Sequence, residues 1–113
     1  MRKAFNQLLV DTCFLSRFLH RFLTNMQKTK EPEALIQLVD KYEPCLLKLK
    51  KLPDFYSSTK HCFGDLRKSP METKDTYSRL LKLYTQVCTL ESLFDFEDRE
   101  EIYENMRTKN IPL

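Results

Sequence analysis

Glycine is nearly absent from this chain: Gly64 is the single one among 113 residues. Glycine supplies the positive φ angles of tight β-hairpins and the close backbone approach of phosphate-binding loops. A P-loop, a dinucleotide-binding fingerprint and a glycine-rich β-sandwich are therefore disfavoured. The length fits one domain with one core, and 42% hydrophobic with 31% charged residues is typical of a folded globular protein. We therefore predict an all-α fold, a single compact helical bundle over residues 1–113.

Long apolar runs are also missing. No run approaches the roughly 20 apolar residues that a transmembrane helix requires. The segment MRKAFNQLLVDTCFLSRFLHRFL begins with a basic pair, but Asp11, Arg17, His20 and Arg21 interrupt it before it reaches the apolar length of a signal peptide. We therefore expect an intracellular protein, cytoplasmic or nuclear, with no membrane span.

The four cysteines, Cys13, Cys45, Cys62 and Cys88, form no CxxC pair. Each falls on or beside an apolar helical stripe, where a reduced cysteine acts as a small buried hydrophobe. We expect four reduced thiols; one or two disulfides or a metal site is the alternative. Structural zinc sites take their ligands as close pairs, and the only close pair here is His61–Cys62. The sequence predicts no metal and no cofactor.

The same pair, His61 and Cys62, is the only hint of a nucleophile beside a base. Successive residues on a helix point about 100° apart, so adjacency places these two side chains in different directions. A catalytic cysteine also needs an orienting group and an oxyanion hole, and no segment supplies them. We predict that the chain is not an enzyme.

Apolar residues at helical spacing predict four to five helices. The first covers residues 2–27 and carries so broad an apolar stripe that it must contact two neighbours. The second starts at Pro32, the third follows Pro53 with Asp54 as its expected N-cap, and a charged helix ends the chain. Ser69, with a proline next and a glutamate three residues on, predicts a capping box at the start of the fourth helix.

The second helix contains Pro44 within a stripe that keeps its register from Leu35 to Leu52. Proline removes one helical hydrogen bond and costs about 3 kcal/mol in a helix interior. Two interpretations fit: a continuous helix kinked at Pro44, which we prefer, or a helix broken near Glu43. A bend that opened a groove would place Tyr42, Cys45, Leu49 and residues 53–55 along its border.

Charge is distributed unevenly along the chain. Residues 1–90 hold 16 Lys/Arg and nine Asp/Glu, whereas residues 91–113 hold three and seven, which makes the C-terminal segment acidic. A basic set is expected to converge across the turn at Pro53 and to meet phosphate or an acidic partner. Its members are Lys48, Lys51, Lys60, Arg67 and Lys68.

Aromatic and other apolar residues exceed what one stripe per helix can bury. The excess must either fill a dense core or face another chain, and exposed aromatic residues are the usual anchors of protein interfaces. The candidate partner-binding residues are Phe14, Phe18, Tyr42, Leu49, Phe55, Phe63, Phe94 and Phe96.

The segment LKKLPDFYSSTKHCFGDLRKSP, residues 49–70, resembles the middle of the N-terminal domain family of the transcription elongation factor TFIIS. That family carries an L-K-x-L-P turn, a glycine and an L-R-K segment, and its small helical bundles bind short disordered motifs. Here the stretch between Pro53 and Leu66 is shorter, and HCFG replaces a threonine-isoleucine-glycine element. The resemblance implies a transcription-associated binding module, and we assign no family from it.

Together these features predict a non-enzymatic protein–protein interaction module, a subunit or adaptor that binds a partner helix or a short acidic or amphipathic peptide. Homo- or hetero-oligomers fit the same features. A nucleic-acid-associated helical module is one alternative, and a small secreted cytokine-like protein is another. The secreted alternative predicts disulfides, which titration of free thiols in the native protein would detect.

Overall fold

A computed structural model describes the backbone of residues 2–108 and the side chains from residue 7 to residue 108. These residues form five α-helices and one 3₁₀ turn, which confirms the predicted all-α bundle. The helices are α1 (Arg2–Lys28), α2 (Pro32–Leu46), α3 (Pro53–Lys68), α4 (Lys74–Glu91) and α5 (Phe96–Thr108), and the 3₁₀ turn η1 (Leu47–Leu49) follows α2 directly.

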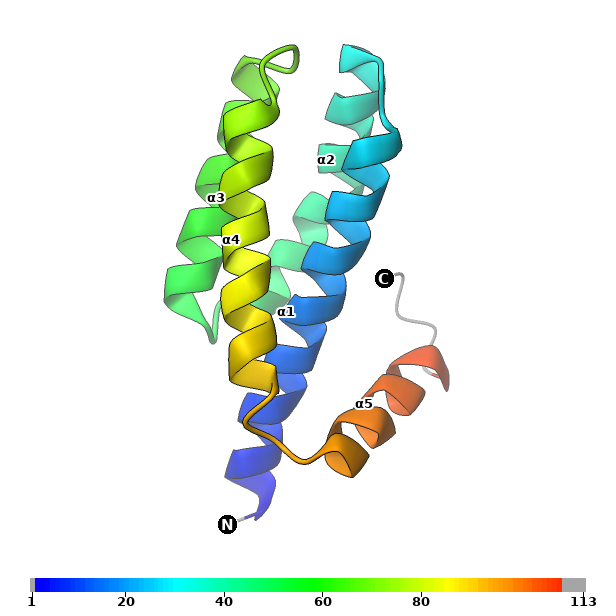
Figure 1. Ribbon diagram of the computed structural model, residues 1–113, viewed down its shortest axis with the longest axis vertical. Coiled ribbons are helices and arrows are strands. Elements are labelled where there is room, and N and C mark those ends of the chain that lie inside the picture. The colour runs from blue at the N-terminus through cyan, green and yellow to red at the C-terminus, as the bar shows by residue number, and fades with distance from the viewer. Residues whose placement is uncertain (1, 109–113) are drawn as a thin grey trace.

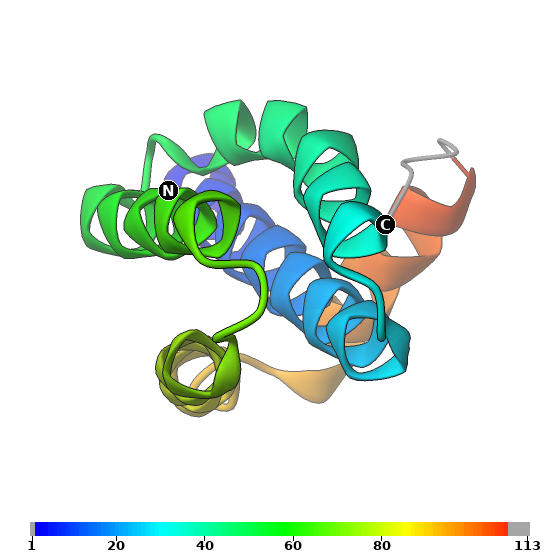
Figure 2. The same ribbon diagram turned by 90° about the horizontal axis from the view of Figure 1, so that it is seen from above.

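The first four helices run alternately up and down along the long axis of the molecule (Figure 1). Each packs against the next in sequence, and α4 packs back against α1, which closes the bundle (Figure 2). Helix α5 leaves this arrangement after a short turn and crosses the N-terminal half of α1 at an angle (Figure 1). Among the clefts that result, one lies between α2 and α3 and another between α1, α4 and α5.

Helix α1 is the central element, with contacts to α2, η1, α4 and α5. Five consecutive residues, 12–16, are buried, which is possible only when neighbours cover more than one side of a helix. The broad apolar stripe predicted contact with two neighbours. The structure adds a third side, because α5 covers Leu9 and Cys13 together with Phe94, which lies two residues before this helix.

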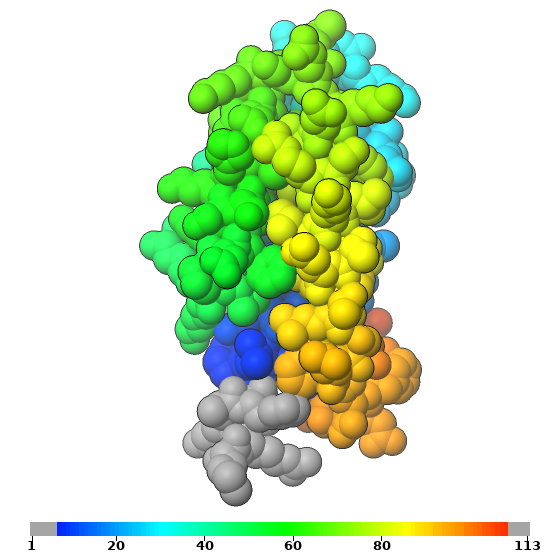
Figure 3. Space-filling model, turned by 60° about the vertical axis from the view of Figure 1, so that its left-hand side comes forward, coloured from blue at the N-terminus to red at the C-terminus, as the bar shows by residue number. Residues whose placement is uncertain are grey.

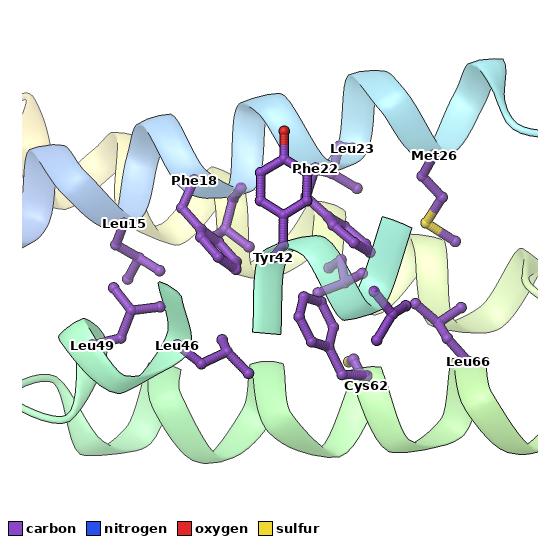
Figure 4. Close-up of a cluster of buried hydrophobic side chains, with 14 of the residues drawn as sticks. Leu15, Phe18, Phe22, Leu23, Met26, Tyr42, Leu46, Leu49, Cys62 and Leu66 are labelled. Atoms are coloured by element: carbon purple, nitrogen blue, oxygen red, sulfur yellow. The ribbon is translucent and has the colours of Figure 1, made fainter. Parts of the chain in front are cut away.

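Aromatic rings fill the centre of the bundle. Tyr42 of α2 meets Phe18 and Phe22 of α1 edge to face, each at 5.7 Å between ring centroids. Phe63 of α3 lies 4.7 Å from Phe22. The Tyr42 ring points toward α1 (Figure 4), and its hydroxyl accepts a hydrogen bond of 3.1 Å from the amide of Asn25. Tyr42 therefore buries its ring without leaving its polar atom unpaired.

The second helix continues through Pro44 to Leu46 and tightens into η1 at Leu47. This outcome confirms that the helix is continuous at Pro44 and shows that a break near Glu43 is wrong. Pro44 and Asp40 are exposed, so the carbonyl that loses its helical donor faces water and the cost of the proline is reduced. The buried face stays continuous across it, from Leu35 to Leu49.

Two predicted helix starts are wrong. Ser69 ends α3 by donating its backbone N–H to Asp65, and the N–H of Glu72 donates to the carbonyl of Ser69, which closes a turn. Proline is favoured at the second position of such a turn, so the same residues that resemble a capping box form a connection, and α4 begins at Lys74. Likewise α3 begins at Pro53 itself, which places Asp54 in its first turn.

The four cysteines are free thiols, and Cys13 and Cys62 are buried. Within residues 2–108, none of the helices combines the length and apolarity that crossing a membrane would need.

Replacing Phe22 by alanine tests how much the aromatic centre contributes. Phe22 is fully buried between α2 and α3, so Phe22→Ala is expected to lower the free energy of unfolding by about 3–5 kcal/mol in urea titrations. Phe96→Ala is the matched control, because Phe96 is 64% exposed, and its expected loss is below about 1 kcal/mol. Equal losses for the two variants would contradict the assignment of the core.

Candidate functional site

A groove of about 450 Å³ lies beside Pro44, between α2 and α3. It is lined by Asp40, Glu43, Pro44, Leu46, Leu47, Tyr56 and Lys60. A groove at the proline was expected, but its border differs from the expected one. Tyr42 and Leu49 point into the core instead, because they belong to the buried face that the proline leaves intact.

The charges around this groove are partly paired. Arg67 of α3 donates to Asp40 at 2.7 Å and to Glu43, so one arginine bridges α3 to two acidic residues of α2. Lys60 lies on the α3 side with its ammonium 5.8 Å from the centroid of the Tyr56 ring, and it makes no ion pair with the described carboxylates. Lys60 is thus the charge at this groove that remains open to a partner.

The predicted basic set does not form one patch. Lys48 sits on η1 with its ammonium 5.5 Å from the Phe14 ring, and Lys51 lies in the turn before α3. Arg67 and Lys68 are at the other end of α3, which by helical rise is about 22 Å away. Convergence across the turn was expected from sequence proximity, but a straight 16-residue helix carries the two pairs apart.

Most of the predicted partner-binding residues lie inside the protein. Six are at most 8% exposed and pack in the core: Phe14, Phe18, Tyr42, Leu49, Phe63 and Phe94. Phe55 is half-buried against the core, and Phe96 is 64% exposed at the start of α5. The aromatic excess of the sequence therefore mainly fills the core, and the anchor role remains a prediction for Phe55 and Phe96.

The exposed apolar side chains are spread over the surface. Leu93 and Phe96 follow α4, at one end of the molecule, where the α4–α5 turn continues the surface formed by α3 and α4 (Figure 3). Leu47, 60% exposed, lies in the groove beside Pro44. Leu47 therefore combines exposure with a concave setting, as does Met71, which is 80% exposed and lines a smaller hollow near Pro32 and Pro70.

A second, smaller cleft of about 270 Å³ lies between α1, α4 and α5. It is lined by Ser16, Arg17, His20, Tyr84, Cys88, Glu91, Arg99 and Tyr103. Its polar groups come from three helices that are far apart in the sequence. Within the cleft the Tyr84 hydroxyl lies 3.3 Å from Nδ1 of His20.

Glu91 is the buried acid of this cleft, at 8% exposure, and it is the last residue of α4. The Tyr103 hydroxyl donates to its Oε1 at 2.5 Å, and a terminal nitrogen of Arg99 lies 4.0 Å from the same oxygen. A carboxylate at a helix C-terminus opposes the helix dipole, so these two partners from α5 compensate it. The Arg17 guanidinium stacks over the Tyr103 ring at 4.5 Å.

Burial governs the acid–base properties of this region. Burial, with a smaller contribution from the nearby Glu91 charge, raises the pKa of Cys13 from 9.0 to about 12. Burial and the hydrogen bond to Glu91 raise the pKa of Tyr103 well above its usual 10.0. Burial also raises the thiol pKa of Cys45 and Cys62. Thiols of this kind stay protonated at neutral pH and are poor nucleophiles.

The sequence did not predict the second cleft. Glu91 and Arg99 were counted only as members of an acidic C-terminal segment, and Arg17 as an interruption of an apolar stripe. One local signal was available, an acidic residue at the C-terminal end of a helix, where the dipole disfavours it. That signal does not say which residues compensate it.

No protein-family model, no curated protein and no solved structure matches this chain. The resemblance of residues 49–70 to the TFIIS N-terminal domain family is therefore not extended by a family match.

Removing the Tyr103 hydroxyl tests its bond to Glu91. Tyr103→Phe is expected to lower the free energy of unfolding by about 1–3 kcal/mol at pH 7, the usual value for a hydrogen bond to a charged group. Because the pKa of Tyr103 is raised in the folded protein, the folded state holds a proton that the unfolded chain releases above about pH 10. The stabilisation that the Tyr103–Glu91 hydrogen bond contributes is therefore complete below about pH 10 and declines above it.

The measurement is urea unfolding followed by circular dichroism at pH 7, 9 and 10.5. The difference between the wild-type protein and Tyr103→Phe should shrink at the highest pH. Tyr77→Phe is the matched control, since the Tyr77 hydroxyl accepts from the amide of Gln27 and touches no carboxylate. A Tyr103→Phe loss that stays constant across all three pH values would contradict the assignment.

Proposed function

We propose that the chain is a non-enzymatic interaction module of the cell interior that holds a short amphipathic peptide or partner helix in the groove beside Pro44. The observation that carries this proposal is the position of Leu47, an apolar side chain 60% exposed on the wall of a 450 Å³ hollow. Exposed apolar side chains in concave surfaces are typical anchors for amphipathic segments.

The local backbone explains why Leu47 faces outward. In a 3₁₀ turn, residues three apart lie nearly above one another, so Leu46 and Leu49 share the buried side. Leu47 then falls on the opposite side, next to Pro44. The proline thus marks the point where α2 changes from a core helix into the wall of a groove.

The charges at the groove favour an acidic residue on the partner. Asp40 and Glu43 are already paired with Arg67, whereas Lys60 makes no ion pair with the described residues. A carboxylate on the partner would pair with Lys60 while apolar side chains contact Leu47 and Tyr56. Such an ion pair gives orientation more than affinity, because it stays exposed to water.

The other classes have less support. The basic residues expected to meet nucleic acid lie at opposite ends of α3, and Arg67 is occupied by acidic neighbours. Raised thiol pKa values favour a packing role for Cys13 and Cys62 over a catalytic one.

Selection from a phage-displayed peptide library on the immobilised full chain, in reducing buffer, tests the proposal. We expect enriched peptides to combine apolar residues at helical spacing with an Asp or Glu. Titration of such a peptide should shift the amide resonances of Glu43, of residues 45–47 and of residues 56–60. Leu47→Asp should weaken binding at least tenfold, because it places a charge in the apolar wall. Lys60→Glu should weaken it by a smaller factor.

Leu81→Asp is the matched control, since Leu81 is 43% exposed on α4 and lines none of the grooves described above. Sedimentation equilibrium of the 13.6 kDa chain gives an independent check. Peptides that shift other residues, or that bind Leu47→Asp as tightly as the wild-type protein, would refute the groove. If the chain self-associates, and Phe96→Asp disrupts this association while Leu47→Asp does not, the exposed apolar surface at Phe96 forms a homo-oligomer interface instead.

A further inference from the structure

The cleft between α1, α4 and α5 has no part in the proposed function, yet it collects charged residues from three helices. Arg17 and Arg99 contribute two positive charges and Glu91 one negative charge, so a positive excess remains even when His20 is neutral. Charged side chains in a cleft of this size lose part of their hydration, which is unfavourable unless they are paired. The uncompensated positive charge in the cleft therefore requires a negatively charged partner.

The arginine donors are not all used within the described part of the chain. Arg99 reaches Glu91 with one terminal nitrogen at 4.0 Å, but its Nε is buried and has no acceptor. The Arg17 guanidinium stacks on the Tyr103 ring and makes no ion pair with the described carboxylates. Buried donors without an acceptor are rare in folded proteins, and each one calls for an explanation.

Glu91 does not compensate both arginines of the cleft. Its Oε1 already accepts the Tyr103 hydroxyl and lies 4.0 Å from a terminal nitrogen of Arg99, so this oxygen is committed inside the protein. The Tyr84 and Ser16 hydroxyls add two neutral polar groups to the same wall. The cleft therefore offers guanidinium donors and hydroxyls with one positive charge uncompensated, which is the chemistry that recognises an anion.

We infer that this cleft binds a carboxylate group, held by the guanidinium groups of Arg17 and Arg99. A planar carboxylate fits the fork of a guanidinium with two parallel hydrogen bonds, and both Arg17 and Arg99 line the cleft. A volume of about 270 Å³ limits the ligand to a small organic acid or to the terminal part of a peptide. The inference stands whether or not a partner occupies the groove beside Pro44.

The first test titrates succinate and its neutral diamide, succinamide, into the ¹⁵N-labelled full chain. The Nε–Hε resonance of each arginine reports on the environment of its guanidinium group. Succinate is expected to shift the Arg99 and Arg17 Nε–Hε resonances in a saturable way, and succinamide is not.

A second titration tests whether the carboxylate comes from a protein terminus. It compares an acetylated tripeptide with a free C-terminal carboxylate and the same tripeptide with a C-terminal amide. Tighter binding of the free-acid tripeptide than of succinate would mean that the cleft binds the C-terminus of a protein. Tighter binding of succinate would mean that it binds a small organic acid.

The variants are chosen so that folding and binding can be separated. Arg17→Gln breaks no ion pair of the described residues and should weaken the bound acid at least tenfold while the fold is retained. Arg99→Lys keeps the charge beside Glu91 but removes the planar guanidinium, so the weakening that it causes measures the contribution of the two parallel hydrogen bonds. Arg79→Gln is the matched control, because Arg79 pairs with Asp65 outside this cleft. Circular dichroism confirms that each variant is folded.

Two results would overturn the inference. In the first, neither succinate nor the free-acid tripeptide shifts the Arg17 and Arg99 resonances. In the second, binding occurs but Arg17→Gln weakens it no more than Arg79→Gln does, which would assign it to general surface charge.

Discussion

The burial of α1 on several sides at once is the constraint on which the rest of this structure depends. Residues 12–16 leave no face of the helix free at its centre, so α2, α4 and α5 must each cover part of it. Phe18 and Phe22 extend that centre toward α2 and α3 through Tyr42 and Phe63. Because these rings fill the middle of the bundle, open space remains only where helices diverge at its margins.

Both clefts follow from this arrangement. The groove beside Pro44 lies where α2 ends and η1 turns Leu49 inward, leaving Leu47 outside. The polar cleft lies where α5 departs from the bundle and meets only the flank of α1 and the end of α4. One is apolar with a lysine at its rim, and the other is polar with two arginines. Their different chemistry is why we assign them different ligands.

Pro44 shows how a local cost is tolerated for a tertiary arrangement. A proline inside a helix loses one hydrogen bond, but the freed carbonyl belongs to the exposed Asp40 and is open to water. The buried residues Tyr42, Leu46 and Leu49 keep contact with the core on both sides of it. The helix therefore does not break, because packing of its inner face outweighs the defect on its outer face.

The sequence by itself determined the helices and most of the core. Helical periodicity depends on neighbours within one turn or two, so Leu35 and Leu66 could be recognised as inward-facing without knowledge of any partner. It also determined that Pro44 would sit on the side away from the core. Local signals failed where one pattern has two meanings, as at Ser69 and Pro70, which fit a helix cap and a turn equally well.

Only the tertiary structure decided which charges meet and which aromatic residues stay outside. Arg67 finds Asp40 and Glu43, and Tyr103 finds Glu91, through helix packing that fixes the register of one element against another. The same packing buries Phe94 and leaves Phe96 exposed, although they are two positions apart. Periodicity says which side of a helix is apolar. It does not say how far a neighbouring helix extends over that side, and that distance sets where the clefts lie.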